Sequence, residues 1–176
     1  MAVINIAITN SHALPRWTEV LGLLHEKNAG TPHIHRFRTL HLVESDLNFV
    51  MRLVWGRELM TWAEANQAIN DNQYGGRRGV QDQSAALNKT LSLDIIRYQA
   101  EPATIVDNDA QACYDRILVT LLGYALLRLG MPIHLIRFQC NWLTKAHYRL
   151  RLHDRLTDPY SSNETHVLQG TGQGTG

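Results

Sequence analysis

Carboxylates at the end of a short apolar run are the residues of this chain best suited to chemistry. Asp107 and Asp109 follow Thr104-Ile105-Val106, and this run predicts a buried strand over residues 103–106. Ligands commonly bind at the carboxyl ends of strands in sheets that helices cover, and a carboxylate there can hold Mg²⁺ against a triphosphate. Asp109 is therefore a candidate metal ligand. Asp107, on the same strand face, is either a supporting carboxylate or a surface charge.

A plainer interpretation also fits Asp109 and the aromatic Tyr114, which follows it by five residues. An Asp between a strand and a helix usually caps the helix, because its side chain accepts hydrogen bonds from free backbone N–H groups. Tyr114 would then be an ordinary core aromatic. The local sequence leaves both interpretations open.

Basic residues at two kinds of position are candidates for binding phosphate. Lys27 and Arg38 lie on either side of a break that contains Gly and Pro, and Arg77 and Arg78 lie in the glycine-rich connection 70–79. An ammonium supplies a mobile point charge and a guanidinium supplies a planar fork, and both complement phosphate oxygens. The plainer interpretation is a solvated surface charge in each case, and a simple turn for the connection.

Helices dominate the elements that must position these residues. Apolar residues at helical spacing predict helices over 45–67, 82–98, 114–129 and 133–143. Runs without breakers predict strands over 33–43 and 147–153, besides 103–106. The segment from Pro15 to Lys27 fits a helix or a strand. Together these elements predict an α+β fold that is rich in helix and has short strands.

Bulk composition limits the classes of protein to which the chain can belong. It has 176 residues, of which 44% are hydrophobic, enough to build a core. With 17 Lys and Arg against 16 Asp and Glu, the net charge of +1 gives no whole-chain argument for nucleic acid, although local clusters can still bind phosphates. The two cysteines form neither a CxxC pair nor a dense set, which argues against a disulfide scaffold and a structural zinc site and favours an intracellular location.

Signals for export or membrane insertion are not found in the sequence. Residues 1–9 are mildly apolar, but they have neither a basic leader nor a long apolar core. The most apolar later run, 117–129, is shorter than the roughly 20 residues of a membrane helix and contains Gly123 and Arg128. We therefore predict no signal peptide, no membrane partner and a buried helix at 117–129.

Two other kinds of site have weaker support. His33, His35 and His41 lie in the predicted strand 33–43, where residues two apart share a face and imidazoles could bind Zn²⁺. Neither Cys nor carboxylate completes a short-range set there. An unrelated Mg²⁺ phosphotransferase would need a phosphate-cradling loop, and the chain has no GxxxxGK[ST] motif.

The spacing from Asp109 to Cys113 and Tyr114 resembles the first catalytic box of reverse transcriptases, especially those of non-LTR retrotransposons. The resemblance implies that Asp109 is a catalytic residue and a ligand of Mg²⁺, which bridges the nucleotide phosphates and lowers the pKa of the primer hydroxyl. It also implies that Tyr114 packs under the incoming sugar and excludes a 2′-hydroxyl. Cys113 stands where this family typically has Ala, a small-for-small change that we interpret as packing.

The resemblance covers about residues 15–176, and its elements follow the order of the family. Lys27 and Arg38 match a fingers hairpin, which implies that they bind the nucleotide triphosphate. The pattern from Gln73 to Asp82 is similar to the Gln, Gly, Gly-Arg and Asp that follow the long fingers helix. It implies that Arg77 and Arg78 contact phosphates of the template strand.

The last matching segment, Gly170 to Gly174, resembles the Gly-x-x-Gln-Gly box of the palm. By that resemblance Gln173 helps to hold the pair of template base and nucleotide. The family's second acidic box, an aromatic-x-Asp-Asp, comes after this point and is not in the sequence. Because one aspartate does not hold two divalent ions at useful affinity, we expect this polypeptide alone to be catalytically silent.

The resemblance implies a fingers-and-palm fragment of a right-hand polymerase, with the fingers region at 1–100 and the start of the palm at 101–176. The implied reaction adds dNTPs to the 3′ end of a DNA primer on an RNA template, with two Mg²⁺ ions. The competing hypothesis is a catalytically inactive remnant of a retroelement that binds nucleic acid or is purely structural.

Overall fold

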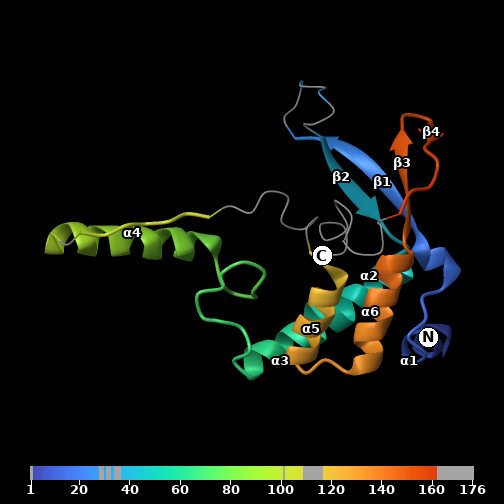
Figure 1. The fold of residues 1–176 in the computed structure, drawn as a ribbon, viewed down its shortest axis with the longest axis horizontal. Helices are drawn as coiled ribbons and strands as arrows, with labels where there is room; N and C mark the ends of the chain where they lie inside the picture. The colour runs from blue at the N-terminus through green and yellow to red at the C-terminus, as the bar shows by residue number, and fades with distance from the viewer. Residues whose placement is uncertain are drawn as a thin grey trace. The chain divides into compact units, whose positions relative to one another are not determined.

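The chain folds into two compact units, which are described separately. The computed structural model describes residues 2–27, 30, 33, 37–100, 102–108 and 117–161 (Figure 1). The first unit comprises Met1–Leu59 with Gln111–Gly176, and the second comprises Met60–Ala110. The predicted division into a fingers region and a palm region at residue 100 concerns parts of a polymerase, and it stays a prediction.

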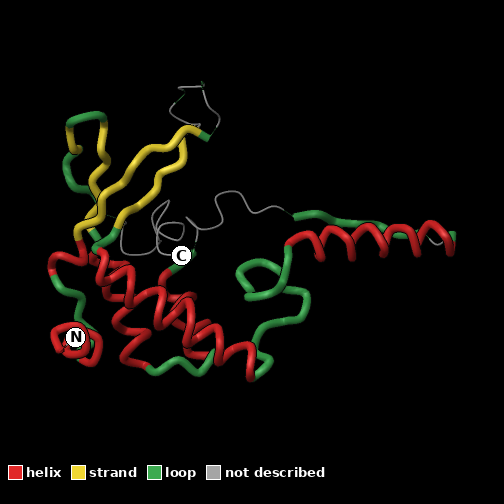
Figure 2. Tube along the Cα trace, turned by 180° about the vertical axis from the view of Figure 1, so that it is seen from behind, coloured by secondary structure: helices red, strands yellow, loops and turns green. Residues whose placement is uncertain are grey.

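A mixed sheet forms one layer of the first unit. Its strands lie in the order β2-β1-β3-β4, with β1 antiparallel to β2 and parallel to β3, and with β3 antiparallel to β4 (Figure 1). Figure 2 draws the strands in yellow, seen from behind. The strand bounds are Glu19–Glu26 for β1, Phe37–Leu42 for β2, His147–Leu152 for β3 and Arg155–Leu156 for β4. The strands predicted at 33–43 and 147–153 are thus confirmed over 37–42 and 147–152. The segment that fitted a helix or a strand is a 3₁₀ turn, η1 (Pro15–Thr18), followed by β1.

The two faces of this sheet differ in burial, because successive side chains of a strand point to opposite sides. One face carries Val20, Gly22, His41 and Tyr148, all of which are buried. Gly22 permits close packing on this face, because a Cβ at this position would lie 2.6 Å from Leu150 Cδ2. The other face is half-buried or exposed along its length.

Helices form much of the remaining described part of the first unit and contribute to its core. They are α1 (Ala2–Thr9), α2 (Ser45–Met51), the π-helical segment η3 (Arg52–Leu59), α5 (Val119–Arg128) and α6 (Ile133–Lys145). The largest buried side chains of the core include Trp17 of η1 and Phe138 and Trp142 of α6. The Trp142 indole N–H donates to the Trp17 carbonyl at 2.8 Å, and the rings of Trp17 and Phe138 meet edge to face at 5.9 Å.

A tight turn joins α5 to α6, and the two helices lie side by side (Figure 1). Gly130 adopts a φ of +77°, and its N–H donates to the Leu127 carbonyl at 3.0 Å, while the Met131 N–H donates to the Leu126 carbonyl at 3.0 Å. This left-handed glycine satisfies carbonyls at the end of α5, and Pro132 then precedes α6. The stop predicted at this position and the helix predicted at 133–143 are confirmed.

The second unit contains α3 (Met60–Ala65), a connection over 66–81, α4 (Asp82–Gln99) and an extended segment at 102–108. Along the chain α2, η3 and α3 follow one another without a break, which confirms the helix predicted at 45–67. Helix α4 confirms the prediction at 82–98. The α+β class is therefore correct.

The strand predicted at 103–106 is wrong. The segment 102–108 is exposed and belongs to no strand, with Ile105 45% and Val106 83% exposed. An apolar run becomes a strand only where a neighbouring strand can pair with its N–H and C=O groups. No described strand pairs with this segment. The helix predicted at 114–129 is described from residue 117 onwards, and there α5 begins at Val119. Residues 114–116 of that prediction are not among the described residues.

Membrane insertion finds no support in the described residues. None of their helices combines the length and the apolar character that crossing a bilayer requires.

Candidate functional site

Two of the predicted nucleotide-binding residues lie at the same end of the β1–β2 pair. Arg38 stands directly opposite His25 in the antiparallel register, and Lys27 directly follows the last residue of β1. All three side chains are exposed. Neither Lys27 nor Arg38 makes a side-chain hydrogen bond or ion pair with any described residue. The register thus places a lysine and an arginine, both open to solvent, where one anion could contact both.

The local sequence explains why this end of the pair is open. Six consecutive residue pairs, from Leu21–Leu42 to Glu26–Phe37, hold β1 and β2 together. Next to the break, the Glu26 carboxylate is bonded within its own segment, since Oε2 accepts a hydrogen bond from the Gly30 N–H at 3.0 Å. The His25 imidazole is within 2.9 Å of the Glu26 carbonyl. These local bonds shape the end of the strand and leave Lys27 and Arg38 free to bind.

The predicted template residues Arg77 and Arg78 differ sharply in their surroundings. Arg77 forms a two-pronged ion pair with Glu64, Nε–Oε1 at 2.8 Å and Nη2–Oε2 at 2.7 Å. Its Nη1 donates to the carbonyls of Asn70 at 3.2 Å and Gln73 at 3.3 Å. The Arg77 side chain is only 14% exposed. Arg77 therefore fastens the connection to α3, whereas Arg78 is exposed and available to an external phosphate.

Electrostatics around Arg77 agree with this structural role. The hydrogen bond from Arg77 lowers the pKa of the Glu64 carboxyl, an effect that the partial desolvation of the pair opposes. The connection turns at Gly76 and Gly79, each with a φ of +77°, a conformation that side chains with a Cβ rarely adopt. The glycine-rich pattern thus forms turns that the half-buried guanidinium of Arg77 holds in place. The template role of Arg77 and Arg78 stays a prediction.

Several predicted site residues, including the aspartate predicted to bind metal, fall in parts of the chain that the structure does not describe. Asp109, Cys113, Tyr114 and Gln173 lie outside the described residues. In the described part of the chain, no group of three or more His, Cys, Asp or Glu side chains is arranged to hold a metal ion. Asp107 is described, and both of its carboxylate oxygens lie 2.6 Å from Lys89 Nζ. This ion pair favours the interpretation of Asp107 as a surface charge.

The histidines considered for zinc lie in unlike surroundings. His41 is buried against the ring of Tyr148, with the ring centroids 4.7 Å apart, and burial lowers its pKa to about 4. His33 is exposed, and His35 lies outside the described residues. The three-histidine site stays an untested alternative.

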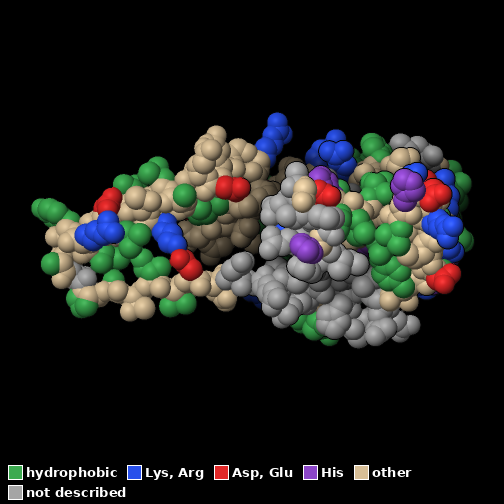
Figure 3. Space-filling view, turned by 90° about the horizontal axis from the view of Figure 1, so that it is seen from above, with side chains coloured by type: hydrophobic (Ala, Val, Ile, Leu, Met, Phe, Trp, Pro, Cys, Tyr) green, Lys and Arg blue, Asp and Glu red, His purple; other side chains and the backbone are tan. Residues whose placement is uncertain are grey.

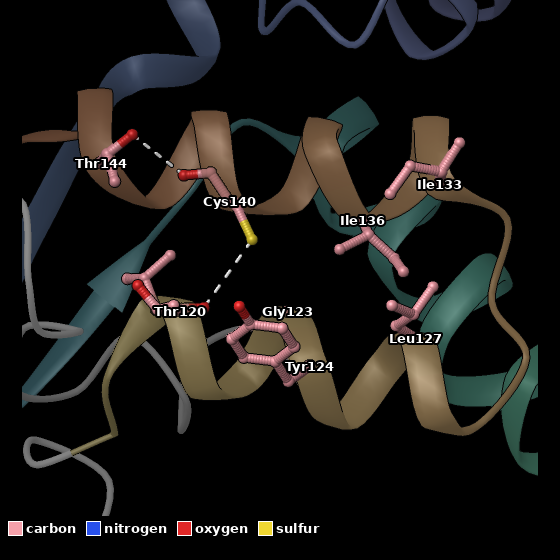
Figure 4. A pocket seen from close by; sticks show the side chains of 9 residues that line it. Thr120, Gly123, Tyr124, Leu127, Ile133, Ile136, Cys140 and Thr144 are labelled. Carbon is pink, nitrogen blue, oxygen red and sulfur yellow. Dashed lines mark hydrogen bonds between the residues drawn. The ribbon is translucent and has the colours of Figure 1, made fainter.

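A groove between α5 and α6 was not foreseen from the sequence. Its volume is about 390 Å³, and Gly123, Tyr124, Leu127, Ile136 and Cys140 contribute to its mostly apolar lining (Figure 4). The Cys140 thiol points across it to the Val119 carbonyl at 3.8 Å, and burial raises the pKa of this thiol. A raised pKa disfavours the reactive thiolate. The sequence signal is the apolar run 117–129. The prediction that it forms a buried helix is wrong for one side of α5, where Leu121, Tyr124 and Leu127 are exposed.

Comparisons with known proteins add no relative. No protein-family model matches the chain, and no curated protein matches it significantly. The functional argument therefore depends on the chain's own residues and on the motifs that they resemble.

Proposed function

We propose that this chain is a fingers-and-palm fragment of a reverse transcriptase of the non-LTR retrotransposon type. The observation that supports it best is the position of Lys27 and Arg38 at one end of an antiparallel strand pair. This pair is followed by the helical segment 45–65, the glycine-rich connection and α4, in the order that the resemblance requires.

In this proposal the two exposed cations bind the triphosphate of a dNTP. The Lys27 ammonium reaches a phosphate oxygen as a mobile charge, and the Arg38 guanidinium donates two parallel hydrogen bonds. Both are exposed, so each exchanges water for phosphate without first breaking an ion pair to a described residue. Arg78, and Arg77 where its internal bonds permit, contact the template backbone.

The remaining roles belong to residues outside the described part. In the proposal Asp109 would be a ligand of Mg²⁺, which would supply positive charge at the transferring phosphate and a lower pKa of the primer hydroxyl. Tyr114 packs under the sugar, and Gln173 contacts the nascent base pair. With a single catalytic aspartate assigned, we expect the 176-residue polypeptide to bind substrates without extending a primer.

Nucleotide binding tests the proposal directly. A fluorescent dNTP titrated into the purified chain should bind. Lys27→Gln and Arg38→Gln should each weaken binding by about 10- to 150-fold, because each removes one charge-assisted contact of about 1.5–3 kcal/mol. Arg155→Gln, which removes an exposed arginine from β4, is the matched control and should leave affinity unchanged. Equal losses in all three variants, or no binding by the unaltered chain, would refute the nucleotide site.

Primer extension separates the enzyme fragment from the inactive remnant. We expect the chain with Mg²⁺, dNTPs and a primed RNA template to give no extension, and measurable extension would contradict the expected silence. If the chain binds no dNTP but binds RNA or DNA with an affinity that survives Asp109→Ala, the noncatalytic binding remnant is the better description.

A further inference from the structure

The half-buried and exposed side of the sheet, here called the open face, mixes leucines with arginines. The residues of the open face that carry the argument are Leu21 and Leu23 of β1, Arg38 and Leu40 of β2, and Arg149 and Arg151 of β3. They share this face because paired residues point to the same side and alternate residues along a strand point to the same side. The opposite, buried face packs against the core of the first unit.

The register sets these side chains in rows across three strands. Arg151 is paired with Leu23, and Leu23 is paired with Leu40. In the next row Arg149 is paired with Leu21. Neighbouring strands lie about 4.8 Å apart and alternate residues of one strand lie about 6.7 Å apart. The result is a band of leucine about two strands wide, with two arginines along its β3 side and Arg38 on its β2 side.

The charge of the open face is predominantly positive. Its described residues include one carboxylate, Glu19, whose Oε2 lies 3.8 Å from Arg149 Nε, too far for a strong hydrogen bond. The Arg151 Nε–H donates to the His153 carbonyl at 3.2 Å. This bond holds the Arg151 side chain in place without using its Nη1 and Nη2 groups, and the residue is exposed. Figure 3 shows basic and imidazole side chains next to hydrophobic ones on the side of the first unit that carries β3 and β4.

We propose that the open face binds the sugar–phosphate backbone of a single-stranded nucleic acid. Arg149 and Arg151 contact phosphates along β3, and the leucine band lies under the sugars and bases. Charge complementarity selects this occupant. A protein that covered the leucines would also have to supply carboxylates for three arginines, whereas a nucleic acid carries a phosphate anion at every nucleotide. The open face presents leucine where sequence-reading sheets present aromatic rings, so binding is sensitive to salt and tolerant of sequence.

Apart from Arg38, which it shares with the proposed nucleotide site, this surface does not depend on polymerase chemistry. It uses neither Asp109 nor a metal ion, and Arg149 and Arg151 belong to none of the sequence motifs on which the proposed function is based. It stands on the register of β3 against β1 and on the charges of the described residues.

The hairpin formed by β3 and β4 offers a closely matched control. Arg155 is paired with Leu152, which lies on the face opposite to that of Arg151, so Arg155 belongs to the other side of the sheet. Arg151→Gln and Arg155→Gln therefore remove the same charge from the same hairpin and differ in the face that loses it. Both side chains are exposed, so neither substitution disturbs the core.

The experiment measures binding of a fluorescein-labelled single-stranded RNA of about 12 nucleotides, without dNTP or Mg²⁺, between about 50 and 200 mM salt. We expect Arg151→Gln and Arg149→Gln each to lower the slope of log K against log salt by about 0.7, the value for one phosphate contact on a single strand. Arg155→Gln should leave the slope unchanged. Circular dichroism confirms that each variant is folded.

Three results would overturn the inference: no binding at the lowest salt, equal losses for Arg151→Gln and Arg155→Gln, or a salt slope that Arg149→Gln and Arg151→Gln leave unaltered. The last result would show that other cations, such as Arg78, make the RNA contacts. A chain that fails to bind dNTP but shows the Arg151 effect refutes the nucleotide site alone, and the opposite pattern refutes the open face alone.

Discussion

Arg77 and Glu64, thirteen residues apart in the sequence, form a parallel fork of two hydrogen bonds, at 2.8 and 2.7 Å. The same guanidinium donates from Nη1 to two carbonyls of the glycine-rich connection. An arginine that pairs with a carboxylate in this way has both its charge and its planar geometry satisfied. One side chain therefore closes the connection 66–81 onto α3.

Removing either partner should loosen the connection. We expect Arg77→Gln and Glu64→Gln to speed amide hydrogen exchange over 66–81, because the carbonyls of Asn70 and Gln73 lose their donor or the guanidinium loses its anchor. Arg78→Gln, which changes the neighbouring exposed arginine, should leave exchange unaltered. Equal acceleration in the Arg77 and Arg78 variants would show that charge alone, and not this ion pair, orders the segment.

The same pair should respond to acid in a defined direction. Arg77 lowers the pKa of Glu64 in the folded chain. The stabilisation that the ion pair gives to the connection is therefore complete at a pH above the ordinary pKa of a glutamate carboxyl, and it is lost as the pH falls through the lowered pKa. Protection of residues 66–81 should therefore fall on acidification in the unaltered chain. The Glu64→Gln variant should lack this part of the acid response, and an unchanged response would contradict the assignment.

The buried hydrogen bond between Trp142 and Trp17 makes a second prediction. Trp142→Phe keeps most of the apolar surface but leaves the buried Trp17 carbonyl without its 2.8 Å donor. We expect the free energy of unfolding, measured with urea, to fall by about 1–3 kcal/mol. Trp62→Phe, at a site that is 43% exposed, should change it by less than about 0.5 kcal/mol. Similar losses in both variants would contradict a special role for the buried bond.

Tyr114 gives a prediction about sugar selection. In an active polymerase that contains this segment, Tyr114→Ala should raise the use of ribonucleotides, because it removes the aromatic ring that the family resemblance places against a 2′-hydroxyl. Tyr124→Ala is the matched control, since Tyr124 lies in α5 and is 66% exposed. The measurement is the ratio of kcat/KM for a ribonucleotide to that for its deoxy counterpart, and an unchanged ratio would contradict the role of Tyr114.

Local sequence patterns predicted the helices well, but they could not predict the pairing between strands that lie far apart in the sequence. The leucines and isoleucines of α4 and α6 repeat at helical spacing, so α4 (82–99) and α6 (133–145) could be predicted from neighbouring residues. The segment from Pro15 to Lys27 fitted a helix or a strand. What makes β1 a strand is its pairing with β2 on one side and with β3 on the other, and β3 comes more than 120 residues later in the chain. The run at 103–106 failed as a strand for the converse reason, since it has no described partner.

The candidate site shows the same limit. The sequence identified Lys27 and Arg38 as cations, and the register then placed them at one end of a strand pair. It also identified Arg77 as a cation, but the partner Glu64 belongs to no motif and could be found only in three dimensions. The grouping of Arg149 and Arg151 with Arg38 needs the parallel register of β1 and β3, which residue types do not reveal.

His41 links the buried face of the sheet to stability against acid. Its side chain is 1% exposed and packs on Tyr148, and the loss of water around the imidazole lowers its pKa from 6.5 to about 4. The unfolded chain therefore takes up a proton near pH 6.5 that the folded chain takes up only near pH 4. The free energy of unfolding should fall as the pH falls between these values, by roughly 3 kcal/mol from this group.

A His41→Phe variant isolates this contribution, because phenylalanine fills a similar ring-shaped space and does not titrate. Urea unfolding at intervals from about pH 7 to pH 4 should give a steeper loss of stability for the unaltered chain than for the variant, since carboxylates and other histidines titrate in both. His153→Phe, at an exposed turn position, should keep the steeper dependence. Parallel curves for the unaltered chain and His41→Phe would show that the buried imidazole does not govern the acid sensitivity of this unit.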